Sequence, residues 1–176
     1  MSILKVARLG HPIIRNVALP VSQKEIESKG IQVLIDDMIE TMHEYDGVGL
    51  AAPQIHIAKQ IAVIEVKDNL RYPDVSKIPL TVIINPKIKN RSKKYVDTWE
   101  GCLSIPDLRG IVSRSESLVC EALDRYGKSL KIDASGFFAR VIQHECDHLE
   151  GRVYLDRMHD LTSLSHLLEF GRYHAN

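Results

Sequence analysis

The sequence predicts an α+β fold of mainly antiparallel β-strands packed around a central helix, and three observations support this prediction. The predicted elements follow the order helix, several strands, helix, without the regular strand–helix alternation of a doubly wound sheet. The central helix is expected where an HExxH motif lies in a stretch with helical periodicity. No repeat, low-complexity tract or interdomain linker is visible, so we expect a single domain over residues 1–176.

An N-terminal amphipathic helix is predicted after an extended start. Ser22 and Glu25 have the spacing of a capping box, in which each side chain accepts a hydrogen bond from a free backbone N–H at the helix start. Apolar side chains then recur at steps of three and four residues, at Ile31, Leu34, Ile35, Met38 and Met42. Gly30 is a candidate interruption of this helix, and Gly47 and Gly49 are expected to end it.

Runs of apolar and β-branched residues predict five strands, at 60–66, 80–85, 95–99, 118–123 and 130–134. Tyr126 and Gly127 separate the last two runs and indicate a hairpin turn. The segment 67–79 is polar and contains two prolines, so it is predicted to be a surface loop.

Two further helices are expected toward the C-terminus. The first is predicted from about Ser135 to Gly151, because glycine is frequent just after the last turn of a helix. The second is a tail helix over 159–176, where four leucines have helical spacing: Leu161, Leu164, Leu167 and Leu168. We expect the tail to pack on the domain or against a second subunit.

Charge and composition argue against several classes of protein. Lys plus Arg and Asp plus Glu both number 23, so no broad attraction to nucleic acid or acidic membranes is expected. No apolar run approaches the ~20 residues that a membrane span needs, and the start has no signal-type stretch, so the expected location is cytoplasmic. Three cysteines are too few, and odd in number, for a disulfide framework.

The strongest chemical signal is the HExxH sequence that runs from His144 to His148. Residues four apart lie on one face of a helix, so both imidazoles can reach one metal ion while Glu145 lies beside it. The alternative is a pair of histidines on a solvated helix with an incidental glutamate.

A metal site built on two histidines needs another ligand, because a catalytic metal usually has three protein ligands and one open position. Cys102, in the sequence EGCLS at the end of a predicted strand, is the favoured candidate. Glu150 and Asp156 follow the motif but lack a supporting pattern. The alternative for Cys102 is a small buried hydrophobic residue, which is the commoner fate of a free cysteine.

A segment of small residues, GVGLAAPQ at 47–54, forms a third candidate region. Its glycines and alanines permit close approach to the backbone, and Gln54 adds a neutral donor and acceptor. It does not match a phosphate-binding loop, because no GK[ST] sequence follows. A helix C-terminal turn with small residues for packing is the alternative.

These three segments, 47–54, 100–104 (EGCLS) and 143–148 (QHECDH), resemble the three signature motifs of the peptide deformylases in sequence, order and separation. The resemblance extends to GHPIIR at 10–15 and LEGRVYLDR at 149–157, and so covers about residues 3–158. It implies removal of the N-formyl group from the formyl-methionine of newly made polypeptides, with release of formate.

Carried over residue by residue, the resemblance implies one divalent metal ion held by Cys102, His144 and His148, with a water at the fourth position. Glu145 would accept the proton of this water and later protonate the leaving amine. The ligand types alone would suggest zinc. The resemblance instead implies Fe(II), with zinc, nickel and cobalt as possible substitutes, and hence sensitivity to oxygen.

The resemblance also implies how the substrate is held. Gln54 and the backbone N–H of Leu103 would donate hydrogen bonds to the oxyanion of the tetrahedral intermediate. N-formylmethionyl peptides are the implied substrates. Further substrate contacts are implied for Val48, Gly49, Glu100 and Arg109.

Two positions depart from the family pattern, since His56 and Asp107 stand where glycine is usual. If the backbone at His56 requires a positive φ, histidine adopts it less freely than glycine. Asp107 is expected near the substrate path, where an acidic side chain could alter preference beyond methionine. Neither position coincides with a metal ligand or with Glu145.

Two other functions fit parts of the sequence. A metallopeptidase would use HExxH with a third ligand other than Cys102, and a non-enzymatic metal protein would not need Glu145 or Gln54. In relatives a C-terminal helix contacts the ribosome. Here the tail after Met158 has one arginine and three histidines, which provide little to bind RNA phosphates, and no direct nucleic-acid site is evident.

Overall fold

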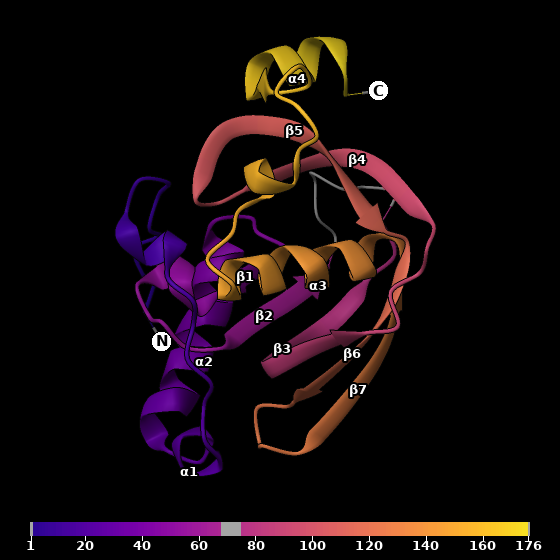
Figure 1. Cartoon of the computed structure of the whole chain (residues 1–176). Coiled ribbons are helices and arrows are strands. Elements are labelled where there is room, and N and C mark those ends of the chain that lie inside the picture. Colours follow the sequence, from indigo (N-terminus) through magenta and orange to yellow (C-terminus); the bar gives the residue numbers. More distant parts are fainter. Residues whose placement is uncertain (1, 68–74, 176) are drawn as a thin grey trace.

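The computed structural model describes residues 2–67 and 75–175 and has an α+β architecture with antiparallel sheets, as predicted (Figure 1). The larger sheet has five strands in the order β1-β2-β3-β6-β7, each antiparallel to its neighbours. The strands of this sheet are β1 (Gly49–Ala51), β2 (Ile61–Val66), β3 (Ile78–Lys89), β6 (Ser117–Leu123) and β7 (Ser129–Ser135).

The smaller sheet has the order β4-β5-β8 and lies toward the C-terminal end of the molecule (Figure 1). Its strands are β4 (Tyr95–Cys102), β5 (Ile105–Ser115) and β8 (Ser165–His166). The α-helices are α1 (Gln23–Ile26), α2 (Lys29–Glu44), α3 (Gly136–Leu149) and α4 (Leu167–Tyr173). The short 3-10 helices are η1 (Pro12–Arg15), η2 (Ala52–Ile55) and η3 (Tyr154–Arg157).

The larger sheet is buried on both faces because successive side chains of a strand point to opposite sides. In β2, Ala62 and Ile64 belong to the core under α3, whereas Ile61 and Val63 belong to the core under α2. Figure 1 shows α3 lying along the sheet. The sheet therefore fixes α3 from one side, and β4 and β5 approach α3 from the other.

The N-terminal helix differs from the prediction in its breaks. Glu27 and Ser28 separate α1 from α2, and the Ser28 hydroxyl accepts a hydrogen bond from the backbone N–H of Ile31 at 3.3 Å. Gly30 lies inside α2 and does not interrupt it. The helix ends at Glu44, before the predicted glycines, and Gly49 instead begins β1.

Strand β5 was not predicted, because Pro106, Asp107 and Gly110 give its sequence the composition of a turn. Pairing with β4 overrides this local composition, with Thr98 opposite Val112 and Glu100 opposite Gly110. β4 is correspondingly longer than predicted.

Two other predicted boundaries change. Residues 68–74 of the predicted loop 67–79 lie outside the described residues, and β3 begins at Ile78, within that loop. The tail is helical only over Leu167–Tyr173, because the two residues before it pair with β5 as β8.

Among the described residues, no helix combines the length and apolar character that a bilayer crossing requires.

Candidate metal centre and active site

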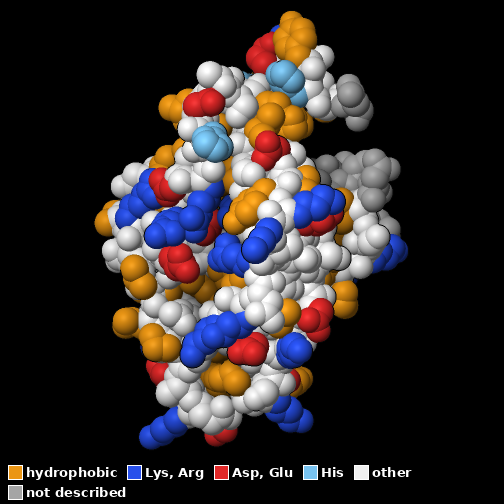
Figure 2. All heavy atoms as spheres, turned by 45° about the vertical axis from the view of Figure 1, so that its right-hand side comes forward, with side chains coloured by type: hydrophobic (Ala, Val, Ile, Leu, Met, Phe, Trp, Pro, Cys, Tyr) orange, Lys and Arg blue, Asp and Glu red, His pale blue; other side chains and the backbone are white. Residues whose placement is uncertain are grey.

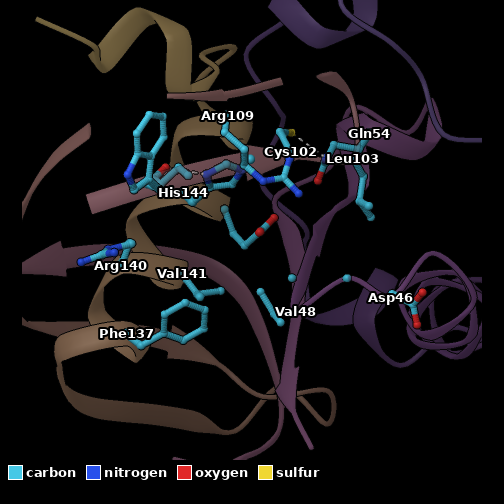
Figure 3. A pocket seen from close by; sticks show the side chains of 16 residues that line it. Asp46, Val48, Gln54, Cys102, Leu103, Arg109, Phe137, Arg140, Val141 and His144 are labelled. Carbon is cyan, nitrogen blue, oxygen red and sulfur yellow. Dashed lines mark hydrogen bonds and ion pairs between the residues drawn. The ribbon is translucent and has the colours of Figure 1, made fainter. Parts of the chain in front are cut away.

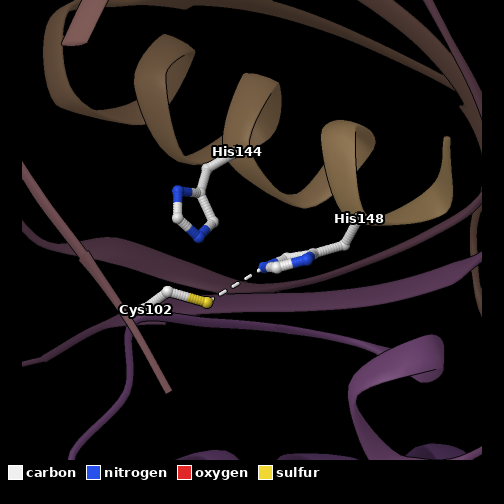
Figure 4. Close-up of side chains that lie close together, drawn as sticks. All are labelled: Cys102, His144 and His148. Atoms are coloured by element: carbon white, nitrogen blue, oxygen red, sulfur yellow. Dashed lines mark hydrogen bonds between the residues drawn. The ribbon is translucent and has the colours of Figure 1, made fainter. Parts of the chain in front are cut away.

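Helix α3 carries His144 and His148 on the face that is turned toward β4 (Figure 4). The two residues are one turn apart, and their ring centroids are 5.0 Å apart. His148 is buried and His144 is largely buried. The helical spacing alone therefore directs two imidazoles to one point.

Cys102 reaches the same point from the end of β4. The pairing of β4 with β5 is irregular between Glu100 and Cys102, and an irregularity of this kind re-aims side chains at the end of a strand. A Cβ atom on Gly101 would collide with the guanidinium of Arg109, so only glycine fits at this position without a shift. The Sγ atom of Cys102 lies 3.2 Å from Nε2 of His148.

The three side chains form a metal-sized cluster. One ligand atom from each of Cys102, His144 and His148 lies within 4.8 Å of the others (Figure 4). Ligand atoms around a tetrahedral metal with Cys and His ligands are on the order of 3.5 Å apart, from bond lengths of about 2.3 and 2.0 Å. The donor set and its spacing fit a divalent metal ion.

The charges at this cluster also favour a cation. Burial raises the pKa of the Cys102 thiol, but the charge of His148 and hydrogen bonds with both histidines hold its pKa well below the ordinary value. Burial lowers the pKa of His144, but Cys102 and Glu100 more than offset this and raise its pKa well above the ordinary value. The thiolate and the carboxylate therefore stabilise a positive charge at His144, and a metal ion that binds here would replace the imidazole proton.

Glu100 is held behind His144 by a buried ion network. Its Oε2 atom lies 2.9 Å from Nδ1 of His144, and Arg114 donates two hydrogen bonds to its carboxylate, at 2.8 and 3.0 Å. Arg114 also bonds to Asp147 at 2.5 Å, and Arg157 bonds to the same carboxylate at 2.6 Å. The Glu100 carboxylate is therefore placed to orient His144, and the same residue also lines the cavity beside the cluster. A contact of Glu100 with the substrate stays a prediction.

Glu145 lies next to the cluster of Cys102, His144 and His148, and against β1. It is buried, and its Oε2 atom has no hydrogen-bond partner among the described residues. Burial raises the pKa of Glu145 to about 7, against the opposing charges of the two histidines. A Cβ atom on Gly49 would collide with this carboxylate, so the glycine permits the close approach. A carboxyl group in this state can both accept and donate a proton near neutral pH.

Gln54 is fixed by η2 on the other side of Cys102 (Figure 3). Its Oε1 atom accepts a hydrogen bond from the backbone N–H of Ala51 at 2.9 Å, which sets the orientation of the amide. The Nε2 atom then points toward Cys102 and Ser104, at 3.5 Å from Sγ and 3.2 Å from Oγ. Leu103 follows Cys102 and lines a cavity beside the cluster of metal-binding side chains.

A cavity opens beside the cluster, and one part of its lining is apolar. Figure 3 shows Val48, Phe137 and Val141 on one side of it, with His144 and Arg109 on another. Trp99 also lines the cavity. Phe137 and Val141 share a face of α3 with His144, so helical periodicity could have identified them as pocket residues.

Both departures from the family pattern have positive φ angles, 67° at His56 and 62° at Asp107. This explains why glycine suits these positions. Asp107 borders a neighbouring cavity of about 380 Å³ that is also lined by Cys102, Leu103 and Arg109.

Arg114 and Asp147 were not singled out from the sequence, because an ion pair between distant segments leaves no local pattern.

Comparison with known proteins gives a consistent result. The family model described as polypeptide deformylase matches residues 3–163. Peptide deformylase 1 of Bordetella pertussis is 44% identical over 161 residues, which are 92% of this chain and 90% of the relative. Peptide deformylase 2 of Pseudomonas putida is 42% identical over the same length and the same shares of both chains.

Solved structures show the same similarity. A class I type b peptide deformylase from Acinetobacter baumannii, bound to Met-Ala-Ser, superposes with a TM-score of 0.87 at 40% identity, covering 90% of this chain and all of the other. A peptide deformylase from Synechococcus elongatus in complex with actinonin has a TM-score of 0.82 at 35% identity. That match covers 98% of this chain and 86% of the other.

Proposed function

Because this chain belongs to the polypeptide deformylase family and is a peptide deformylase, we propose that Cys102, His144 and His148 hold its catalytic metal and that Glu145 is its acid–base group. The enzyme is a metal-dependent hydrolase that removes the N-formyl group from formyl-methionine at the start of new polypeptides and releases formate. The convergence of three metal-binding side chains beside a buried glutamate is the observation that supports the residue assignment.

The metal supplies, when bound, a positive charge that polarises the formyl group and acidifies the attacking water. Glu145 accepts a proton from that water, since its carboxylate is buried beside the cluster and has a pKa of about 7. As the C–N bond breaks, the same group returns the proton to the leaving amine. The products are formate and a peptide with a free N-terminus.

The oxyanion is stabilised by neutral donors that the fold holds in place. Ala51 fixes the amide of Gln54 so that its N–H group faces the side of Cys102, and the backbone N–H of Leu103 is the second donor. Donors that are already oriented need no rearrangement when charge develops, and loss of one typically costs about 2.7–4 kcal/mol.

The substrate backbone is bound by the edge of the larger sheet. β1 is the outermost strand of that sheet, so the outer edge at Gly49, and at Val48 just before it, can pair with an extended peptide. The methionine side chain enters the apolar part of the cavity, where flexible, polarizable thioethers pack well. Arg109 lies at the boundary with the neighbouring cavity, where the chain after methionine continues.

The metal is Fe(II) in this proposal, with zinc, nickel or cobalt as substitutes. The ligand types alone favour zinc, but a mixed thiolate and imidazole site accepts each of these ions, and the choice of Fe(II) rests on the family. Deformylation of new polypeptides requires access to translation products, and we place the enzyme in the cytoplasm. A ribosome contact like that of relatives stays a prediction. In this structure the rings of Phe170 and His174 in the tail pack on Trp99, so these two side chains contact the domain itself.

The assignment is tested by formate release from formyl-Met-Ala-Ser under anaerobic conditions, with Glu145→Gln as the variant. The amide cannot accept the proton, so we expect kcat to fall by about 10²–10⁴-fold while the metal content stays at one per chain. A metal-loaded Glu145→Gln enzyme with parental activity would show that another group moves the proton.

A further inference from the structure

Trp99 connects the substrate cavity with the C-terminal tail. The residue belongs to β4, its side chain is half-buried, and it lines the cavity that contains Val48, Phe137 and Val141. Phe137 and Val141 lie in α3, and Val48 immediately precedes β1 of the larger sheet, whereas Trp99 comes from the smaller sheet. The cavity is therefore bounded in part by a wall that does not belong to the main core.

The tail contacts this wall through two aromatic rings. The centroid of the Phe170 ring lies 5.0 Å from that of Trp99 at an interplanar angle of 64°, and the His174 ring lies 4.9 Å away at 37°. Both distances fall in the range of favourable aromatic pairs. Phe170 is half-buried, whereas the other residues of α4 are exposed, so its ring is the side chain of α4 that packs most closely on the domain. Figures 1 and 2 show α4 projecting at the end of the molecule, where hydrophobic and histidine side chains gather.

A second attachment of the tail reaches the same wall. β8 pairs with β5 so that Ser165 lies opposite Arg109, and the hydroxyl of Ser163 accepts a hydrogen bond from the backbone N–H of Ile111 at 3.1 Å. Arg109 also lines the cavity. Two cavity residues on neighbouring strands, Trp99 and Arg109, are thus both backed by one segment, residues 163–174.

We propose that Phe170 and His174 are positioning residues that fix the indole of Trp99 and thereby set the size of the first side chain that the cavity accepts. The proposal rests on the substrate site described above. Without the two rings, the outer face of the indole would be in water, and the side chain could move between rotamers. With them, the indole is packed from outside, and the cavity keeps one width.

The location of the contact determines which kinetic constant responds. Trp99 is not among the three clustered metal ligands, and the acid–base group and Gln54 lie on α3 and η2. Movement of the indole therefore weakens binding of the substrate side chain and leaves the reacting atoms in place. A peptide with a short first side chain does not reach the wall and should be affected less.

The kinetic test compares Phe170→Ala with the parent on formyl-Met-Ala-Ser and formyl-Ala-Ala-Ser. We expect KM for the methionine peptide to rise by roughly threefold to tenfold, the range that one aromatic pair can supply. The kcat value should stay within about twofold, and KM for the alanine peptide should change little.

Two control variants accompany this test. Phe170→Tyr, which keeps the ring, should have the parental KM. Leu168→Ala removes a side chain of the same helix that is 65% exposed, and should match the parent.

Fluorescence provides a readout that does not depend on catalysis, because Trp99 is the only tryptophan in the chain. Phe170→Ala should move its emission to longer wavelength and weaken binding of the product Met-Ala-Ser in a fluorescence titration, whereas Leu168→Ala should do neither. A parent that binds this peptide but releases no formate would disprove the proposed chemistry and leave this comparison valid. Unchanged emission and peptide affinity in Phe170→Ala, or an equal loss of kcat with both peptides, would overturn the positioning role.

Discussion

Gly49 shows how a single missing side chain makes room for the proposed acid–base group. The residue lies in β1, and the carboxylate of Glu145 occupies the space where a Cβ atom would be. Glu145 is itself buried, and it borders the substrate cavity. The glycine therefore leaves room for the carboxylate beside the strand that we propose binds the peptide.

Replacement of Gly49 by alanine should reduce activity without loss of the metal. The added methyl group forces the Glu145 carboxylate out of place, and a shift of about 1 Å at a catalytic group can cost on the order of 10²-fold in rate. Formate release and metal content, measured on the same preparation, test this expectation.

Gly30→Ala is the matched control for this substitution. A Cβ atom at Gly30 meets only the Ser28 hydroxyl, at 3.9 Å, and the residue lies inside α2. We expect unchanged activity and a free energy of unfolding about 0.5–1 kcal/mol higher. Equal activity in Gly49→Ala and Gly30→Ala would show that Glu145 does not need its present position.

Arg114 joins elements that are distant in sequence. It lies in β5, bonds to Glu100 in β4 and to Asp147 in α3, and is itself almost fully buried. Burial alone would raise the pKa of Glu100, but hydrogen bonds from His144 and Arg114 hold it at about 2. Burial likewise opposes ionisation of Asp147, and Arg157 and Arg114 keep its pKa below the ordinary value.

These lowered pKa values make the free energy of unfolding depend on pH. Each carboxylate contributes stability that is fully present above its unfolded pKa, near 4, and that is lost as the pH falls toward its folded pKa. The free energy of unfolding, measured in urea with a chelator present, should therefore fall between about pH 4.5 and pH 2.

Arg114→Met should lower the free energy of unfolding at pH 7 by about 3–5 kcal/mol, because it removes the buried cation that two buried carboxylates share. Glu100 would then keep only His144 as a partner, and Asp147 only Arg157. Its stability should also fall less steeply with acid than that of the parent. Lys94→Met is the control, since it removes an exposed pair with Glu116 that is worth about 0–1 kcal/mol. Equal losses in the two variants would contradict a stabilising role for the buried network.

Elements with strong local periodicity were predictable, and those held by pairing alone were not. The stripe of apolar residues on α2 follows from sequence because one helix face is buried, and Met38 and Met42 are fully buried as expected. Strand β5 was missed because its turn-like residues become a strand only through the register with β4. Among the site residues, the HExxH histidines lie close in sequence, whereas Arg114 becomes relevant only when β5 meets α3.

The fold as a whole brings the site together from two sheets. α3 is fixed by the larger sheet, and Cys102 comes from the smaller sheet. The cluster of Cys102, His144 and His148 therefore lies where the two sheets approach each other. A metal that binds all three side chains links segments separated by 42 residues, from Cys102 to His144. Metal binding should therefore stabilise the folded chain against unfolding.

Removal of the metal should lower Tm as well as activity. A ligand that binds only the folded state adds about 2.7 kcal/mol at a concentration 100 times its Kd, so the metal-loaded enzyme should unfold at a higher temperature than the chelator-treated one. Anaerobic addition of Fe(II) or Ni(II) should restore both Tm and formate release. In Cys102→Ser the difference in Tm between the two states should shrink, and a full difference there would argue against cysteine ligation.

X-ray absorption at the metal K-edge of anaerobically purified enzyme would identify the bound ion and its ligands together. We expect one sulfur scatterer at about 2.3 Å and imidazole nitrogens at about 2.0–2.1 Å if the ion is zinc, with an iron edge and similar ligand types if it is Fe(II). The sulfur scatterer should disappear in Cys102→Ser. A metal shell without sulfur in the parent enzyme would contradict the assignment of Cys102, His144 and His148 as the ligands.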